Sequence, residues 1–312
     1  MDNLINLIGI PLDLGAENLG VDIGPQAFRY QHIVQKLSSA GLEIKDHGDI
    51  IVRPRKDIEI GDERLRYADE IIRVNQEVAQ LTDTIISSGQ KIVALGGDHS
   101  INLGLISGAS AALKQDLVMI YLDAHGDMNT KDTTLSGNIH GMHVASLLGL
   151  GDERLSNLYS QGRKLSPNNL LHIGGSDWDQ AELDLISRLN IKTFTLFDLL
   201  SNNLAPLLKL IDEISQISSN VWVSLDLDVI DQIYAPAAGM PNAKGLTYRE
   251  IATIAEYIGQ KCRVIGVDVV EFNPLQDVNY KTADLGIELI AKFLGQNLSW
   301  YTGYMERNKI NA

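Results

Sequence analysis

Cysteine is almost missing from this 312-residue chain, which contains only Cys262. No disulfide can therefore form within the chain, and a reducing compartment fits that composition. Because Cys262 lies just before the apolar run VIGVDVV, we expect a buried small side chain rather than a nucleophile.

Long apolar runs are missing too, and so is a leader-like N-terminus. No stretch approaches the ~18 apolar residues that a membrane span requires. The first residues, MDNLINLIGIPLD, carry no basic segment and are typical of a strand rather than of a signal peptide. We therefore expect a cytoplasmic protein without a membrane partner.

Basic residues are scarce, since 26 Lys and Arg stand against 40 Asp and Glu, for a net charge of −14. A protein that binds nucleic acid normally carries a basic stripe, so we expect no nucleic-acid partner. An acidic chain can attract a cationic substrate through its long-range field, but a solvated acidic surface gives the same balance. Charge alone therefore does not identify the substrate.

No linker rich in Pro, Gly or Ser divides the chain, and no repeat of fixed period is present. Apolar, β-prone runs alternate with helical patterns along most of its length. The expected strands are residues 5–10, 43–46, 91–95, 117–122, 170–173, 193–196, 221–225 and 263–270. The clearest expected helices are residues 67–88, 248–259 and 282–294, the second after a capping box of Thr247 and Glu250. This order predicts an α/β protein, a three-layer α/β/α sandwich with a mostly parallel eight-stranded sheet, as a single domain over residues 1–312.

Three of the expected strands run directly into polar motifs: GGDHS at 96–100, DAHGDMN at 123–129 and SLDLD at 224–228. Open α/β sheets bind ligands just beyond the carboxyl ends of their strands. Aspartates and histidines spaced by two residues at a strand end point to one side. The candidate metal ligands are two imidazoles and four carboxylates: His99, Asp123, His125, Asp127, Asp226 and Asp228.

This carboxylate-rich set suits Mn²⁺ better than a structural zinc site, which favours Cys and His. A bridging carboxylate can hold two ions roughly 3.5–4 Å apart, where they share a hydroxide nucleophile. Any one motif has an ordinary alternative, because an Asp pair at a strand end is often a cap and a buried His is usually a satisfied core residue. Three such motifs at three strand ends, in a chain with seven His, favour a catalytic two-metal site.

The ordered motifs resemble those of the ureohydrolase superfamily, and within it the arginase family. The likeness runs over nearly the whole chain and also includes GVDIGPQAFR at 20–29, SGNIHG at 136–141, GLTYRE at 245–250 and DVVEFNP at 268–274. It implies the arginase-like fold, two Mn²⁺ per subunit, and a homo-oligomer, either a trimer or a hexamer. It also implies that a hydroxide bridging both ions attacks the guanidinium carbon of L-arginine, giving L-ornithine and urea.

The resemblance assigns the metal ligands to two ions. One ion would be held by His99, Asp123, Asp127 and Asp226, and the other by Asp123, His125, Asp226 and Asp228. Asp123 and Asp226 would therefore bridge the pair.

The catalytic residues that the resemblance implies are His140, Glu271 and the metal ligand Asp127. His140 matches a proton-carrying histidine, and an unperturbed pKa near ~6.5 suits that work. Glu271 matches a glutamate that pairs with the substrate guanidinium in a bidentate fork. From the residues alone, a solvated surface histidine and a strand-end carboxylate turned to water remain alternatives.

A further set of polar residues matches the family's groups for the amino-acid head of the substrate. Donors to the α-carboxylate, directly or through water, would be Asn129, Thr134, Ser136 and Asn138. Acceptors near the α-amino group would be Asp177, Asp179 and Glu182. A zwitterion needs both kinds of group, although the same residue types are common in ordinary turns.

One position departs from the family pattern. The segment APAAGMP at 235–241 has Met240 where the family has threonine, and methionine forms no useful hydrogen bond. Lys244 is less typical as well. The first alternative is therefore another ureohydrolase (an agmatinase, a formiminoglutamase or a guanidino-acid hydrolase). A second alternative, of another class, is a non-catalytic, metal-binding regulatory protein.

Overall fold

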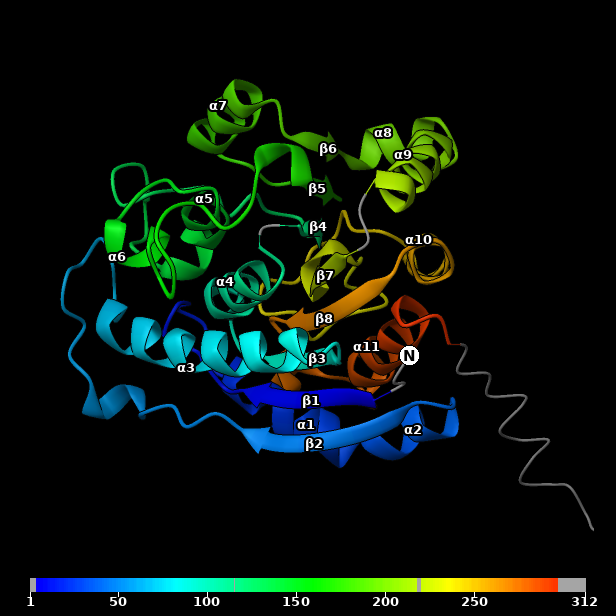
Figure 1. Ribbon diagram of the computed structural model, residues 1–312, viewed down its shortest axis with the longest axis horizontal. Coiled ribbons are helices and arrows are strands. Elements are labelled where there is room, and N and C mark those ends of the chain that lie inside the picture. Colours follow the sequence, from blue (N-terminus) through cyan, green and yellow to red (C-terminus); the bar gives the residue numbers. More distant parts are fainter. Residues whose placement is uncertain (1–3, 115, 218–219, 297–312) are drawn as a thin grey trace, which may run out of the picture.

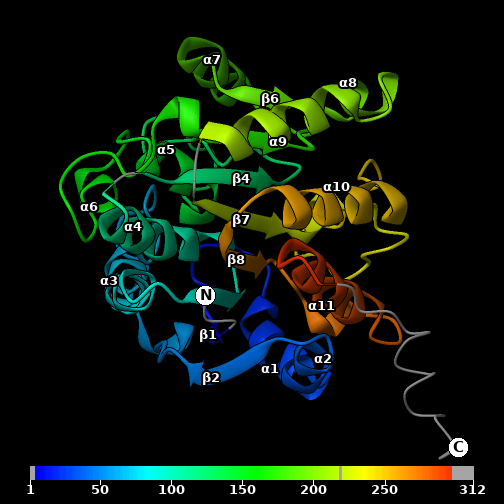
Figure 2. The ribbon, with the colours of Figure 1, turned by 45° about the vertical axis from the view of Figure 1, so that its right-hand side comes forward.

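A computed structural model describes residues 4–114, 116–217 and 220–296. Its middle layer is an eight-stranded parallel sheet, and helices cover both faces (Figures 1 and 2). The predicted α/β/α fold is confirmed. The strands are β1 (Leu4–Ile10), β2 (Glu43–Asp49), β3 (Lys91–Gly96), β4 (Val118–Leu122), β5 (Leu170–Ile173), β6 (Lys192–Phe194), β7 (Val221–Asp226) and β8 (Val264–Val270).

The helices fill the segments between strands. The α-helices are α1 (Gly24–Tyr30), α2 (Ile33–Ser39), α3 (Ala68–Ser87), α4 (Asn102–Ala112), α5 (His143–Leu147), α6 (Glu153–Ser156), α7 (Gln180–Leu189), α8 (Leu196–Ser201), α9 (Ala205–Ile217), α10 (Tyr248–Lys261) and α11 (Lys281–Phe293). Short 3-10 helices are η1 (Val21–Ile23), η2 (Arg55–Asp57), η3 (His99–Ile101), η4 (Ile139–Met142), η5 (Pro167–Asn169), η6 (Leu227–Val229) and η7 (Pro274–Gln276). Within the described ranges, no helix is long and apolar enough to cross a membrane.

Capping residues explain where several helices begin. The predicted capping box at α10 is confirmed, since Glu250 Oε2 accepts a hydrogen bond from the Thr247 backbone N–H at 2.7 Å. The strand predicted for residues 193–196 ends earlier, at Phe194. Thr195 instead forms a second capping box with Asp198 and starts α8, because its hydroxyl satisfies a backbone N–H of the first helical turn.

Successive residues of each strand pack on opposite faces of the sheet. In β3, Val93 and Leu95 contact the core that α1, α2 and α8 to α11 cover, whereas Ile92 and Ala94 contact the core under α3 to α7. Burial of one large aliphatic side chain contributes roughly 1.5–3 kcal/mol. Cys262 is buried in the first core, as predicted.

The sheet order places four strands with chemical motifs side by side. The order is β2-β1-β3-β8-β7-β4-β5-β6. The chain passes from β3 to β4 across a gap that β7 and β8 later fill. In this register, Val269 of β8 lies opposite both Leu95 and Leu225, and Leu225 lies opposite Leu122. The carboxyl ends of β3, β8, β7 and β4 therefore lie side by side at the same edge of the sheet.

Glu70 on α3 ties the long segment after β2 to the helix layer. Its buried carboxylate accepts hydrogen bonds from the Arg53 backbone N–H at 3.0 Å and from Arg53 Nε at 2.7 Å, and from Arg73 Nη2 at 2.8 Å. Burial by itself would raise the pKa of Glu70, but hydrogen bonds from Arg73 and Arg53 outweigh this effect and lower the pKa to about 2.

Replacing Glu70 with Gln should lower the free energy of unfolding by about 1–3 kcal/mol at neutral pH, because charged hydrogen bonds are lost. A lowered pKa in the folded state means that this stabilisation is present above pH 4.5 and disappears as the pH falls toward about 2. Urea unfolding of both proteins from pH 7 to pH 3 should show the difference shrinking below pH 4.5.

Glu77→Gln is the matched control, since Glu77 forms a more exposed pair with Arg73 at 3.3 Å. Such pairs contribute about 0.3–0.5 kcal/mol. A Glu70→Gln protein as stable as this control would contradict the structural role of the carboxylate.

Candidate active site

His99 reaches the site from the turn after β3. The preceding residue, Asp98, caps η3 by accepting a hydrogen bond from the Ser100 backbone N–H at 2.9 Å. Its other oxygen accepts from the Gly15 backbone N–H at 2.7 Å, which fixes a second loop at this rim. The His99 ring is thereby held inside the protein, where it is fully buried.

A hydrogen-bond relay determines which nitrogen of His99 carries a proton. His99 Nε2 donates to Ser224 Oγ at 2.9 Å, and this hydroxyl donates to Asp268 Oδ1 at 2.8 Å. Asp268 also accepts from Trp222 Nε1 and from Asn102 Nδ2. Because Nε2 is the donor, Nδ1 presents its lone pair to the interior of the site.

His99 Nδ1 faces three carboxylates at close range. It lies 3.0 Å from Asp123 Oδ2, 3.2 Å from Asp226 Oδ2 and 3.5 Å from Asp127 Oδ2. This buried nitrogen has no hydrogen-bond partner in the part of the chain that the structure describes. A lone pair among carboxylate oxygens requires positive charge between them, so the donor set fits a divalent cation.

A second group of the same kind surrounds His125. Its Nδ1 lies 2.9 Å from Asp228 Oδ2 and 3.5 Å from Asp123 Oδ1. The two oxygens of Asp123 thus face different imidazoles, which is the arrangement of a bridging carboxylate. The close groupings are His99, Asp123 and Asp226 on one side, and Asp123, His125 and Asp228 on the other. A contact of Asp226 with the second position stays a prediction.

The four carboxylates strongly influence one another's charge. Burial and the neighbouring carboxylates raise the pKa of Asp226 well above its usual range, raise that of Asp228, and raise that of Asp127 to about 7. Burial also opposes the charge of Asp123, but His125 and His99 offset it and lower its pKa. Cations among these groups would relieve the repulsion and let all four ionise.

His140 and Glu271 form an ion pair at the mouth of this cluster. His140 Nδ1 lies 3.2 Å from Glu271 Oε1. Burial favours a neutral ring, but Glu271 offsets it and raises the pKa of His140 to about 9, above the ~6.5 expected from the sequence. Glu271 has a left-handed backbone (φ 58°), and a side chain at Gly239 would overlap its Oε2.

The predicted residues for the amino-acid head surround a cavity of about 350 Å³ next to the metal ligands. Six of the seven line it: Asn129, Ser136, Asn138, Asp177, Asp179 and Glu182. Thr134 is not among the lining residues. Its hydroxyl accepts a hydrogen bond from the Gly137 backbone N–H at 2.9 Å, so it shapes the loop.

The acidic residues of this cavity differ in how many of their carboxylate oxygens already accept hydrogen bonds within the protein. Both oxygens of Glu182 accept backbone N–H groups, from Met128 and Asp179, at 3.1 Å. Asp179 caps α7 and accepts from Asn129 Nδ2 at 2.7 Å. Asp177 is exposed at the rim, 3.9 Å from His125 Nε2. Asp177 is therefore the acid with most room for a ligand, and Glu182 holds the walls in place.

Met240 lines both this cavity and a second one of about 480 Å³. The two cavities also share His125 and Asp177, and Lys244 is among the lining residues of the second. The thioether therefore stands in the wall of the site, where its apolar character can affect binding.

The comparisons with known proteins agree with one another. Residues 3–295 match the model of the arginase family. The chain belongs to the arginase family. It is 38% identical to the arginase of Brevibacillus brevis over 300 residues, covering 96% of this chain and 100% of that protein. The arginase structures from Bacillus caldovelox (TM-score 0.89) and Bacillus cereus (0.87) are each 34% identical, covering 95% of this chain and 99% of theirs.

Membership of the arginase family makes the chain a hydrolase of the ureohydrolase type. Together with the two His and Asp groupings, it indicates a binuclear metal site.

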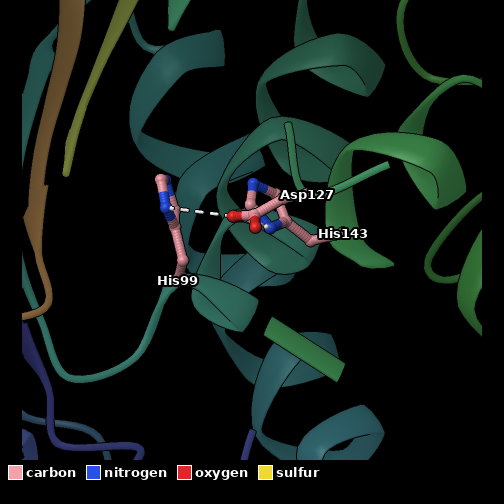
Figure 3. A group of neighbouring side chains, drawn as sticks. All are labelled: His99, Asp127 and His143. Carbon is pink, nitrogen blue, oxygen red and sulfur yellow. Dashed lines mark ion pairs between the residues drawn. The ribbon is translucent and has the colours of Figure 1, made fainter. Parts of the chain in front are cut away.

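Two buried residues of this arginase-family site were not predicted from the sequence. Tyr121 in β4 lies two residues before Asp123, which directly follows the strand, and an alternating spacing brings the two side chains to the same side. His143 lies three residues after His140, within the same helical turns, and forms a third close grouping with His99 and Asp127 (Figure 3). The spacing of Tyr121 from Asp123 and of His143 from His140 is the sequence signal by which both residues could have been predicted.

Asp123→Asn should abolish binding of both metal ions by this arginase-family protein, because each position loses a carboxylate that both share. The variant should stay folded, since removal of one charge relieves repulsion among the remaining acids. Elemental analysis after metal loading and thermal unfolding measure the two effects.

The control is Asp132→Asn, which alters an exposed aspartate of the neighbouring loop. It should retain the metal content of the unaltered protein. Full metal stoichiometry in Asp123→Asn would disprove the role of Asp123.

Proposed function

We propose that the protein is a binuclear manganese hydrolase that converts L-arginine to L-ornithine and urea. One observation carries the proposal: a single cavity is lined both by four of the six proposed metal ligands, His125, Asp127, Asp226 and Asp228, and by the polar groups suited to an amino-acid head. A cavity that offers both sets of groups suits a substrate with a cationic end and a zwitterionic end.

The metal ligands support manganese because carboxylates outnumber imidazoles four to two among them. His99, Asp123, Asp127 and Asp226 would hold one ion, and Asp123, His125, Asp226 and Asp228 the other. When bound, the ions supply Lewis acidity and lower the pKa of a water nucleophile to near neutrality.

Glu271 is placed to orient the guanidinium group. Its Oε1 accepts a hydrogen bond from the His99 backbone N–H at 3.0 Å, which fixes the carboxylate beside the metal ligands. Because Gly239 has no side chain, Oε2 is free to extend toward the cavity. A carboxylate held in this way can form two parallel hydrogen bonds with a planar cation.

His140 is placed to deliver a proton to the leaving amine. While paired with Glu271, it holds a proton at Nδ1 because its pKa is raised to about 9. A substrate guanidinium that takes over Glu271 removes this stabilisation, so the pKa of His140 falls. The histidine then becomes a better general acid as the substrate reaches its reacting position.

The amino-acid head would be bound on the opposite wall. Asn129, Ser136 and Asn138 offer donors for its carboxylate, and Asp177 and Asp179 offer acceptors for its ammonium group. Thr134 and Glu182 would act indirectly, by holding the loop and the start of α7 in shape.

The protein loaded with Mn²⁺ should release urea and ornithine in equal amounts from L-arginine, whereas metal-free protein should release neither. In Met240→Thr, a new hydroxyl hydrogen bond contributes about 0.5–1.5 kcal/mol. KM for L-arginine should therefore fall about two- to tenfold with unchanged metal content. Product assays over a range of arginine concentrations measure both results.

A panel of guanidino substrates tests the alternatives. Faster urea release from agmatine than from L-arginine would identify an agmatinase, and preference for formiminoglutamate or a guanidino acid would identify the corresponding relative. A metal-loaded protein without turnover on any of them would favour the regulatory alternative.

Glu271→Gln should lower the pKa of His140 from about 9 toward ~6.5, because a neutral amide no longer favours the charged imidazole. The ring signal of His140, followed by NMR in metal-free protein between pH 5 and pH 10, reports this shift. His47, on the distant strand β2, serves as the internal control. An unchanged His140 titration would contradict the pairing.

The cytoplasmic location, the trimer or hexamer and the single domain over residues 1–312 stay predictions from the sequence.

A further inference from the structure

The back of the His99-side metal position, away from the cavity, is closed by Tyr121 and His143. Both side chains are fully buried, and neither lines the substrate cavity. Neither has a part in the reaction described above. The ligand atoms that they contact all face His99 rather than His125.

The Tyr121 hydroxyl lies between two proposed metal ligands. It is 2.5 Å from Asp123 Oδ2 and 2.8 Å from Asp127 Oδ2. These are the same two oxygens that face His99 Nδ1. The oxygen of Asp123 that faces His125 is Oδ1, which accepts instead from the His125 backbone N–H. Tyr121 therefore fixes the oxygens of the His99 side only.

His143 supports the same side from another direction. Its Nδ1 donates to the His140 carbonyl oxygen at 2.7 Å, since a carbonyl can only accept. The ring stacks on His99 with centroids 4.4 Å apart, and Nδ1 lies 3.4 Å from Asp127 Oδ2 (Figure 3).

This geometry argues against His143 as a third ligand of an ion at His99. Its Nδ1 already carries a proton, which excludes metal binding through that atom. The remaining lone pair of His143, on Nε2, lies in the plane of its ring. Because the His143 and His99 rings are stacked, their in-plane lone pairs run side by side and do not converge on one ion. His143 therefore acts as a positioning residue that holds the His99 ring and the His140 backbone.

On the His125 side, the hydrogen bonds to the carboxylates come from the backbone: Asp228 Oδ1 accepts from the Ala124 N–H at 3.1 Å, and Asp123 Oδ1 accepts from the His125 N–H at 2.6 Å. Among the described residues, no buried tyrosine or stacked imidazole supports this side. The His125 ring is partly exposed, and its Nε2 lies 3.9 Å from Oδ2 of the exposed Asp177. Residues that hydrogen-bond to metal ligands usually affect metal affinity 10- to 100-fold. The two metal positions are thus held with unequal rigidity.

We propose that Tyr121 and His143 are positioning residues that strengthen metal binding at the His99 side and leave the His125 side unaffected. This inference rests on the binuclear site of the proposed function. It extends that function by assigning to two buried residues a role specific to one ion.

The test introduces Tyr121→Phe into two one-ion backgrounds, because each background isolates one position. His125→Asn should retain the ion at the His99 side, and His99→Asn the ion at the His125 side. In calorimetric titration with Mn²⁺, Tyr121→Phe should weaken binding about 10- to 100-fold in the first background. In the second it should change binding less than about threefold.

His143→Phe keeps a ring against His99 but loses the hydrogen bond to His140. It should weaken the same ion about tenfold in the His125→Asn background and leave the ion of the His99→Asn background in place. At two equivalents of Mn²⁺ in the otherwise unaltered chain, either variant should replace the electron paramagnetic resonance spectrum of a coupled pair with that of an isolated ion.

Tyr257→Phe is the matched control, because it also removes a tyrosine–aspartate hydrogen bond, from Tyr257 to Asp212 at 2.8 Å. It should bind two ions as the unaltered chain does. Equal weakening in both backgrounds, or weakening in neither, would overturn the inference while leaving the binuclear site intact. An unaltered chain that fails to bind two Mn²⁺ would overturn the proposed function and this inference together.

Discussion

Four buried aspartate carboxylates converge on two imidazoles, and their mutual repulsion is the constraint on which the rest of the site depends. Carboxylates this close stay charged together only with positive charge among them. The protein brings them together at the carboxyl ends of β3, β7 and β4, which with β8 form four adjacent parallel strands in one register. Most of the ligands follow within a few residues of a strand, so the rigidity of the sheet fixes their separations.

Hydrogen-bond partners around the ligands decide what each ligand can do. Ser224 and Asp268 select the tautomer of His99, and backbone N–H groups hold one oxygen each of Asp123 and Asp226. The remaining oxygens and the lone pair of His99 are thereby directed to the interior. The chemistry of this site therefore comes from the ligands and from the groups that leave particular atoms free.

Much of this arrangement could be predicted from sequence, because apolar runs and residue spacing are local signals. The eight strands and the grouping of the six proposed ligands follow from such signals. The pairing of His140 with Glu271 joins residues 131 positions apart, and no local pattern reports that contact. The role of Glu182 could not be predicted from the sequence either. Its carboxylate accepts hydrogen bonds from the Met128 and Asp179 backbone N–H groups and is therefore not available to a ligand in the cavity.

The strand order has a consequence for how the protein matures. Strands β3 and β4 directly precede the segments with His99 and Asp123 and are synthesised early. In the folded sheet, however, two other strands lie between them. The intervening β7 and β8 belong to the last third of the chain, and adjacent strands lie about 4.8 Å apart. A chain still lacking β7 and β8 therefore cannot complete either metal grouping. Completion of these two groupings therefore depends on the pairing of strands that are far apart in the sequence, which is a slow step in folding.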